Sequence, residues 1–436
     1  MSLSFLGDLL QTITDRGRDL IRGRAQAPEE GDLSLACETL LSSRGEASGT
    51  GRALAILDRW EALDDAGRLG FLKMLADRYG PDPQRLARAV DAWRADPGPL
   101  TMAALHEAAE PRRQELIRRL NLAPGGIATL VRMREELFRH QGEHPALDAV
   151  DADFVHLFSS WFNRGFLVLR RIDWTTPAHI LEKIIQYEAV HEIAGWDDLR
   201  RRLAPADRRC FGFFHPQLPD EPLIFVEVAL TRDIPATIAE VLAEDRTPIA
   251  AEQATTAVFY SISNCQKGLR AISFGNFLIK QVVEELRRDL PGLDTFVTLS
   301  PVPGFAAWVK GEEGRPAALD QPGWWRDEAV RAEVEQALLP MAARYFVEAR
   351  GRGGRVIDPV ARFHLGNGAR LERINFLGDL SPRGFKQAHG LMVNYLYRLP
   401  DIEKNHEAYA VQGKVVAAPA VTRLLKTAPK SRRKQG

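Results

Sequence analysis

Residues 256–299 of this 436-residue chain read TAVFYSISNCQKGLRAISFGNFLIKQVVEELRRDLPGLDTFVTL, and this stretch decides the fold of the C-terminal half. The runs 256–262 and 296–299 are rich in β-branched and aromatic residues, which favour strands. Between them, residues 277–290 carry apolar side chains at spacings of three and four, which predicts a helix. A strand, a loop, a helix and a further strand form a βαβ-like unit. The sequence therefore predicts a mixed α/β domain around this unit.

The residues on the N-terminal side have a helical pattern. From about 51 to 170, apolar residues recur at helical spacing in the segments 71–79, 84–93, 102–122 and 127–140, with Gly- and Pro-rich breakers between most of them. A further helix at 180–190 and strand-like runs at 209–214 and 223–230 follow. We therefore expect an α+β chain. Its expected parts are an all-helical domain at 1–170, an α/β domain at 171–422, and a basic, disordered tail at 423–436.

Composition excludes several classes of protein. The chain has 58 basic and 58 acidic residues, and this balance argues against a protein that coats nucleic acid. Cys37, Cys210 and Cys265 have no close spacing, so neither a disulfide scaffold nor a cysteine zinc site is predicted. No apolar run reaches the roughly 18 residues that a membrane span needs. The amphipathic N-terminal segment is too acidic for a transit peptide, and we expect a cytoplasmic location.

The loop after the strand 256–262 has the character of an anion site. It leads into a helix N-terminus, where backbone N–H groups lack internal partners and favour phosphate. Small residues allow close approach, and Lys267 and Arg270 add positive charge. The spacing resembles that of the coenzyme A pyrophosphate loop of acetyltransferase-like folds. The candidate binding residues are Arg270, Ala271, Ile272, Ser273, Phe274, Gly275 and Asn276.

Two alternatives for this loop stay open. It could be an ordinary glycine-containing connection. It could also be a nucleophile elbow built on Ser273, with Ala271 in place of the first glycine. An elbow needs its serine directly at the strand end, whereas roughly ten residues separate Ser273 from the end of the strand at 262.

Two further residues are candidates for chemistry. Ser300 ends a predicted strand, because Pro301 and Pro303 have no N–H with which to extend a ladder. A plain turn serine is the alternative. His364 precedes a Gly-Asn-Gly turn and could be a proton donor near neutral pH or a hydrogen-bonded loop residue.

Seven blocks of sequence, in order, resemble the malonyl-CoA decarboxylase family. They are residues 213–216, 221–230, 259–263, 277–280, 299–305, 364–369 and 390–397. The resemblance implies an acetyltransferase-like (GNAT-like) catalytic domain behind a helical domain that drives assembly into a dimer or tetramer. It implies conversion of malonyl-CoA to acetyl-CoA and CO2, with neither a metal nor an organic cofactor.

The resemblance also implies roles for particular residues. The family's acyl-CoA-binding stretch matches residues 270–276, its serine and histidine pair matches Ser300 and His364, and a family active-site tyrosine matches Tyr397. The alternative functions are an acyl-CoA thioesterase using Ser273, an N-acyltransferase, and a non-catalytic malonyl-CoA sensor. Neither a nucleic acid nor a membrane is an expected partner.

Overall fold

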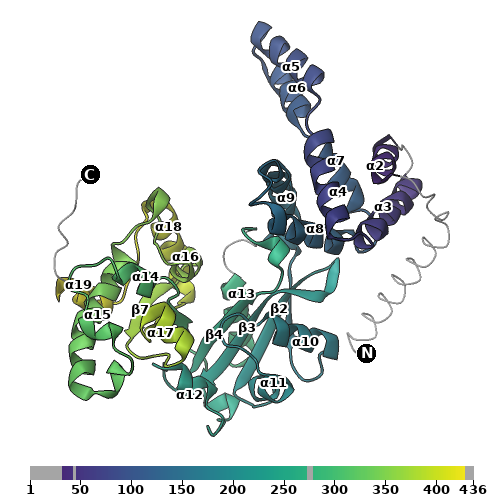
Figure 1. Ribbon diagram of the computed structural model, residues 1–436. Helices are drawn as coiled ribbons and strands as arrows, with labels where there is room; N and C mark the ends of the chain where they lie inside the picture. Colours follow the sequence, from purple (N-terminus) through teal and green to yellow (C-terminus); the bar gives the residue numbers. More distant parts are fainter. Residues whose placement is uncertain (1–31, 43–45, 273–277, 428–436) are drawn as a thin grey trace. The chain divides into compact units, whose positions relative to one another are not determined.

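The computed structural model of the protein describes residues 32–42, 46–272 and 278–427 (Figure 1). Its contacts divide the chain into two compact units. Among the described residues, the first contains those up to Phe166 together with 215–219 and 266–272, and the second contains the others. The predicted α+β order is confirmed, since helices come first and a mixed sheet follows.

Short helices make up most of the first unit. They are α2 (Leu33–Ser42), α3 (Glu46–Glu61), α4 (Asp65–Arg78), α5 (Pro83–Ala95), α6 (Pro99–Ala109), α7 (Arg112–Leu120), α8 (Gly126–His140) and α9 (Leu147–Trp161). The breakers act as helix starts: Pro83 opens α5, and the Asp82 side chain accepts hydrogen bonds from the N–H groups of Gln84 and Arg85. The prediction of one helical segment over 102–122 was wrong. That segment divides into α6 and α7 at Pro111, which cannot donate a backbone hydrogen bond within a helix.

An eight-stranded sheet forms the centre of the second unit. Its strands are β1 (Val168–Ile172), β2 (Arg208–His215), β3 (Leu218–Thr231), β4 (Thr256–Asn264), β5 (Thr295–Thr298), β6 (Ser300–Pro301), β7 (Arg370–Asn375) and β8 (Met392–Leu396). The order across the sheet is β1-β2-β3-β4-β5-β8-β6, and β7 also pairs with β8. Strands β4 and β5 are parallel, while β5, β6 and β7 each run antiparallel to β8. The predicted βαβ unit is thus confirmed, with α13 (Leu278–Asp289) as its crossover helix.

The second unit contains further helices. They are α10 (Ala178–Tyr187), α11 (Trp196–Leu203), α12 (Ile238–Leu242), α14 (Phe305–Val309), α15 (Glu328–Val347), α16 (Pro359–Gly366), α17 (Pro382–Ala388), α18 (Ile402–Gln412) and α19 (Pro419–Thr427). Ile184 of α10 and Leu199 of α11 share one buried apolar cluster with Phe214 and Phe225 of the sheet. Because α19 is helical as far as Thr427, the disordered tail expected from 423 onward is helical in its first residues. Residues 428–436 lie outside the described part of the chain.

Strand β4 is irregular where it leaves its neighbours. The parallel register with β5 ends at Phe259 opposite Thr298, although β4 continues to Asn264. On its other side, Glu227 of β3 pairs with Ser261, whereas the next residue of β3 pairs with Phe259. Tyr260 is therefore the extra residue of a β-bulge, a feature that bends a strand and often lies beside an active site.

Candidate active site

The three predicted catalytic side chains lie together in the second unit. Nε2 of His364 is 3.1 Å from Oγ of Ser300, and Nδ1 of the same imidazole is 2.8 Å from Oη of Tyr397. All three residues are buried, with exposed fractions of 5% or less. The structure thus places a serine, a histidine and a tyrosine in one continuous hydrogen-bonded chain, shielded from water.

His364 lies on helix α16. The alternative expectation of a hydrogen-bonded loop residue was therefore wrong about the loop. Pro359 opens this helix, and the buried Asp358 carboxylate caps it by accepting the Ala361 N–H at 2.8 Å. The Tyr345 hydroxyl also donates to Asp358, at 3.3 Å. Asp358 therefore fixes the helix start and, through it, the position of the imidazole.

The Gly-Asn-Gly sequence ends α16 as a tight turn. Gly368 has a φ of +81°, in the region that favours glycine, and a Cβ there would lie 2.2 Å from the carbonyl oxygen of Ile402. This turn directs the chain from α16 into strand β7.

Ser300 is held by the short strand β6. It pairs with Val393 of β8, and Pro301 pairs with Met392. The predicted strand stop is observed in that β6 ends at Pro301, although this proline still lies within the paired segment. Further on, Gly304 approaches Tyr345 so closely that a Cβ would lie 2.5 Å from its hydroxyl oxygen. A glycine is needed there for the segment after Ser300 to pack under Tyr345.

Tyr397 follows strand β8. Its backbone N–H donates to the Phe296 carbonyl at 2.8 Å, and its ring packs edge-on against Phe259 at a centroid distance of 6.3 Å. The end of β8 is thereby fixed beside β4 and β5, which directs the phenol at the imidazole.

Burial sets the charge state of the site. Desolvation lowers the pKa of His364 to about 3, because a charged imidazolium is disfavoured in a low-dielectric interior. The same cause raises the pKa of Tyr397 well above its ordinary value. At neutral pH the imidazole and the phenol are both uncharged. The reference pKa of about 6.5, on which the expectation of a proton donor near neutral pH was based, therefore does not apply to this buried imidazole.

Sequence reasoning missed two residues that contact the chain of catalytic groups. Thr298 accepts a hydrogen bond from the Ser300 hydroxyl at 2.9 Å, and the ring of Tyr395 stacks on His364 at a centroid distance of 4.6 Å. The available signal was the period of two in a strand, which places Thr298 beside Ser300 and Tyr395 beside Tyr397.

The described part of the predicted acyl-CoA loop, residues 270–272, belongs to the first unit. Residues 267–269 form a short 3₁₀ helix (η3), and Arg270, Ala271 and Ile272 follow it. The buried Arg134 of α8 donates from Nη1 to the carbonyl oxygens of Gly268 and Arg270, at 2.8 and 2.9 Å. The side chain of Arg270 lies over the ring of Phe138, 4.1 Å from its centroid. Ser273, Phe274, Gly275 and Asn276 lie outside the described residues.

Comparisons with known proteins identify the relatives of this chain. The family model for the malonyl-CoA decarboxylase C-terminal domain matches residues 165–435, and the model for the N-terminal domain matches residues 79–162. The mitochondrial malonyl-CoA decarboxylase of Anser anser anser is 37% identical over 391 residues, which are 78% of this chain and 76% of the relative. The chain belongs to the malonyl-CoA decarboxylase family. The mouse protein of the same name is 34% identical over 363 residues, 74% of this chain and 72% of the relative.

Solved structures of the family are similar over most of the chain. The malonyl-CoA decarboxylase of Rhodopseudomonas palustris is 60% identical, with a TM-score of 0.86, and covers 91% of this chain and 100% of its own. The enzyme of Agrobacterium vitis is 64% identical, with the same TM-score and the same coverage. The resemblance inferred from the seven sequence blocks is therefore confirmed at the level of the family.

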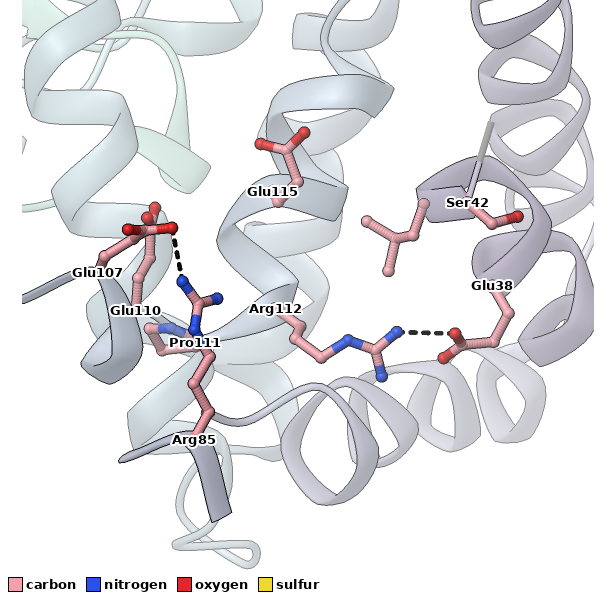
Figure 2. A pocket seen from close by; sticks show the side chains of 9 residues that line it. Glu38, Ser42, Arg85, Glu107, Glu110, Pro111, Arg112 and Glu115 are labelled. Atoms are coloured by element: carbon pink, nitrogen blue, oxygen red, sulfur yellow. Dashed lines mark hydrogen bonds and ion pairs between the residues drawn. The ribbon is translucent and has the colours of Figure 1, made fainter. Parts of the chain in front are cut away.

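A pocket of about 420 Å³ lies among the helices of the first unit (Figure 2). Four carboxylates line it, each in an ion pair with an arginine: Glu38 with Arg112, Glu107 with Arg85, Glu110 with Arg118 and Glu115 with Arg119. Because its positive charges are already neutralised, this pocket is poorly suited to the phosphates of a coenzyme A thioester.

The described residues hold neither a group of three or more potential metal ligands nor a helix long and apolar enough to cross a membrane. The three cysteines are buried and unpaired.

Proposed function

We propose that this chain converts malonyl-CoA to acetyl-CoA and CO2. The observation that carries the proposal is the buried Ser300–His364–Tyr397 chain in a member of the malonyl-CoA decarboxylase family. The homologues' shared name supports the reaction, and the geometry supports the choice of residues.

The substrate supplies its own electron sink. Breaking the bond between the carboxylate carbon and the α-carbon releases CO2 and leaves an electron pair, which the thioester carbonyl delocalises as an enolate. The α-carbon must then take up one proton. The protein therefore has to orient the substrate, keep water out and deliver a proton.

The direction of the hydrogen bonds indicates where that proton resides. The Ser300 hydroxyl donates to Thr298, so its oxygen is free to accept a hydrogen bond from Nε2–H of His364. Nδ1 then accepts the Tyr397 hydroxyl proton. We infer that His364 works as a neutral imidazole. Its Nε2 gives its proton to the α-carbon, and the phenol of Tyr397 resupplies one at Nδ1. The resulting tyrosinate takes up a proton from water when acetyl-CoA leaves, and the tautomer of His364 resets through the same hydrogen bond.

Ser300 has a different task in this scheme. Its oxygen accepts the Nε2–H bond, and this contact fixes the orientation and the tautomer of the imidazole. The uncharged site also favours the reaction, because it disfavours a localised carboxylate charge more than the delocalised charge of an enolate.

The loop at 270–276 is our proposed site for the phosphates of the substrate. Support comes from its resemblance to the family's acyl-CoA-binding stretch and from its place between β4 and α13. Arg270 contributes a guanidinium whose orientation is set by the Phe138 ring.

One experiment tests the reaction directly. The purified protein is incubated with malonyl-CoA, and the products are separated by chromatography. Acetyl-CoA and CO2 are the expected products. Release of free CoA would instead establish a thioesterase, and unchanged substrate with measurable binding would establish a sensor.

Self-association is part of the proposal. The resemblance implies a dimer or tetramer assembled through the helical unit, and the hairpin of α5 and α6 is our candidate for the contact (Figure 1). No residue of α5 is buried, and Leu100 of α6 is 87% exposed. Exposed apolar surface of this kind often marks an interface.

The cytoplasmic location remains a prediction, and the curated relatives are named as mitochondrial proteins.

A further inference from the structure

We propose that Thr298 is a positioning residue for the decarboxylation, because its hydroxyl oxygen fixes the direction in which Ser300 donates its proton. This inference rests on the proposed function and extends it to a residue outside the serine, histidine and tyrosine set.

The contacts of Thr298 hold its oxygen in place. The residue is fully buried, at the last position of β5. Its Oγ1 accepts the Ser300 hydroxyl at 2.9 Å and the Tyr395 N–H at 3.1 Å. Its carbonyl oxygen accepts the Asn394 side-chain amide at 2.8 Å. Two donors thus occupy both lone pairs of Oγ1, and the backbone of the residue cannot move away.

A packing role alone does not explain a hydroxyl at this position. Burying a hydroxyl costs free energy unless it is hydrogen-bonded, so an apolar residue would fill this fully buried position at a lower cost if packing were its only role. Both described partners of Oγ1 contact His364 or belong to a residue that does. One is the Ser300 hydroxyl, and the other is the backbone N–H of Tyr395, whose ring stacks on His364.

The consequence of losing Oγ1 follows from the remaining acceptors. Among the described residues, Nε2 of His364 is the other polar atom shown within hydrogen-bond distance of Ser300 Oγ. Without Thr298 Oγ1, the serine proton turns toward Nε2. The imidazole must then carry its proton on Nδ1, facing Tyr397, and Nε2 has none to deliver. Thr298 therefore selects the productive tautomer.

The test uses a double-mutant cycle with steady-state kinetics on malonyl-CoA. Thr298→Val keeps the shape and removes the acceptor, and we expect kcat to fall about 5- to 20-fold with KM within about twofold. Thr298→Ser restores the acceptor and should recover most of the wild-type kcat. In the Ser300→Ala background, Thr298→Val should change kcat less than about twofold, because the group through which it acts is already gone.

Controls separate this role from a loss of folding. Thr295→Val removes a hydroxyl from the same strand at a side chain that bonds Asp294, and should leave kcat unchanged. Thermal unfolding is recorded for every variant. If Thr298→Val does not fold, Thr298→Cys, whose sulfur is a weak acceptor, is measured in its place with the same expectations.

Three results would overturn the proposal: a wild-type kcat in Thr298→Val, an equal loss in the Ser300→Ala background, or an effect confined to KM. A wild-type protein that releases no CO2 from malonyl-CoA would overturn the proposed function instead, so the two failures are distinguishable.

Discussion

At the scale of single residues, the surroundings of His364 control its chemistry more than its own acidity does. The imidazole is enclosed by Ser300, Tyr395 and Tyr397, none of which is charged at neutral pH. Its pKa of about 3 lies below the ordinary value of roughly 6.5, and burial is the cause. A neutral imidazole can deliver the proton of one nitrogen while the other nitrogen accepts a replacement, which the contact with Tyr397 provides.

This charge state predicts a pH profile. An imidazolium donor with an ordinary pKa would be lost as pH rises, and kcat would fall about tenfold per unit above pH 6.5. A neutral donor is not lost, so we expect kcat to be flat from about pH 6.5 to 8. Initial rates at saturating malonyl-CoA across this range measure it. A tenfold fall per unit would contradict the neutral form.

The same shift has a consequence for stability. Since the folded-state pKa is depressed, the unfolded chain binds more protons between about pH 6.5 and 3. His364 should therefore lower the free energy of unfolding as pH falls through this window. Between pH 7 and pH 5, the free energy of unfolding should therefore fall less in His364→Asn than in the wild type. Denaturant titrations at pH 7 and pH 5 compare the two, and equal pH sensitivity would count against the assignment.

His364→Asn also tests the catalytic role. Asparagine keeps a polar side chain but cannot relay a proton, so kcat should fall by about 10²- to 10⁴-fold with little change in KM. Steady-state kinetics and a calorimetric Kd for coenzyme A provide the measurement. Turnover at the wild-type rate would exclude His364 as the donor and leave Tyr397 as the next candidate.

At the scale of secondary-structure elements, the local sequence pattern predicted which helices and strands form, but it did not predict which strands pair. The β4–α13–β5 unit follows from period-two and period-3.6 runs within one stretch of chain. The pairing of β5 and β6 with β8 joins residues almost a hundred positions apart, as Ser300 and Val393 show, and no local pattern encodes it. Ser300 and His364 could be named from family blocks. The period of two places Thr298 beside Ser300, but its role as a hydrogen-bond acceptor appears only once β5, β6 and β8 are side by side.

Helix α8 holds the loop at 266–272 in place through one buried arginine. Arg134 of α8 is 1% exposed, pairs with Asp151 at 2.8 Å, and binds two carbonyl oxygens of this loop. A Cβ on Gly268 would lie 2.1 Å from the carbonyl oxygen of Val131, which shows how closely α8 supports the loop. The helical unit therefore shapes the segment that we propose binds phosphate.

Arg134→Met should weaken binding of the phosphate-bearing part of the substrate. We expect KM for malonyl-CoA to rise roughly 5- to 20-fold, as for the loss of hydrogen bonds to a charged group. KM for malonyl-pantetheine, which lacks the phosphates, should change little. Arg139→Met on the same helix, where the side chain is exposed, is the matched control. An equal rise for both substrates would indicate general disruption and contradict a specific role in shaping the loop.

At the scale of the whole molecule, the α5–α6 hairpin leaves more of its surface exposed than the helices of a globular unit usually do. A helix in a globular unit normally buries one face, yet among the described residues of this hairpin only Ala108 is buried. Trp93 and Leu105 are partly covered, while Leu100 and Met102 are exposed to 87% and 49%. The family resemblance implies self-association through the helical domain, and we propose this surface as the contact with a second copy of the chain.

Leu100→Glu combined with Met102→Glu should therefore reduce the mass of the assembly in solution. Each carboxylate would lose hydration on entering an apolar contact, and repulsion between symmetric copies would add to the cost. Val411→Glu is the matched control: it converts an equally exposed apolar residue, at 81%, on α18 of the other unit, and should leave the mass unchanged. Light scattering after size exclusion measures the mass, and thermal unfolding verifies the fold. A monomeric wild type, or a double variant that retains the full assembly, would show that the hairpin serves some purpose other than self-association.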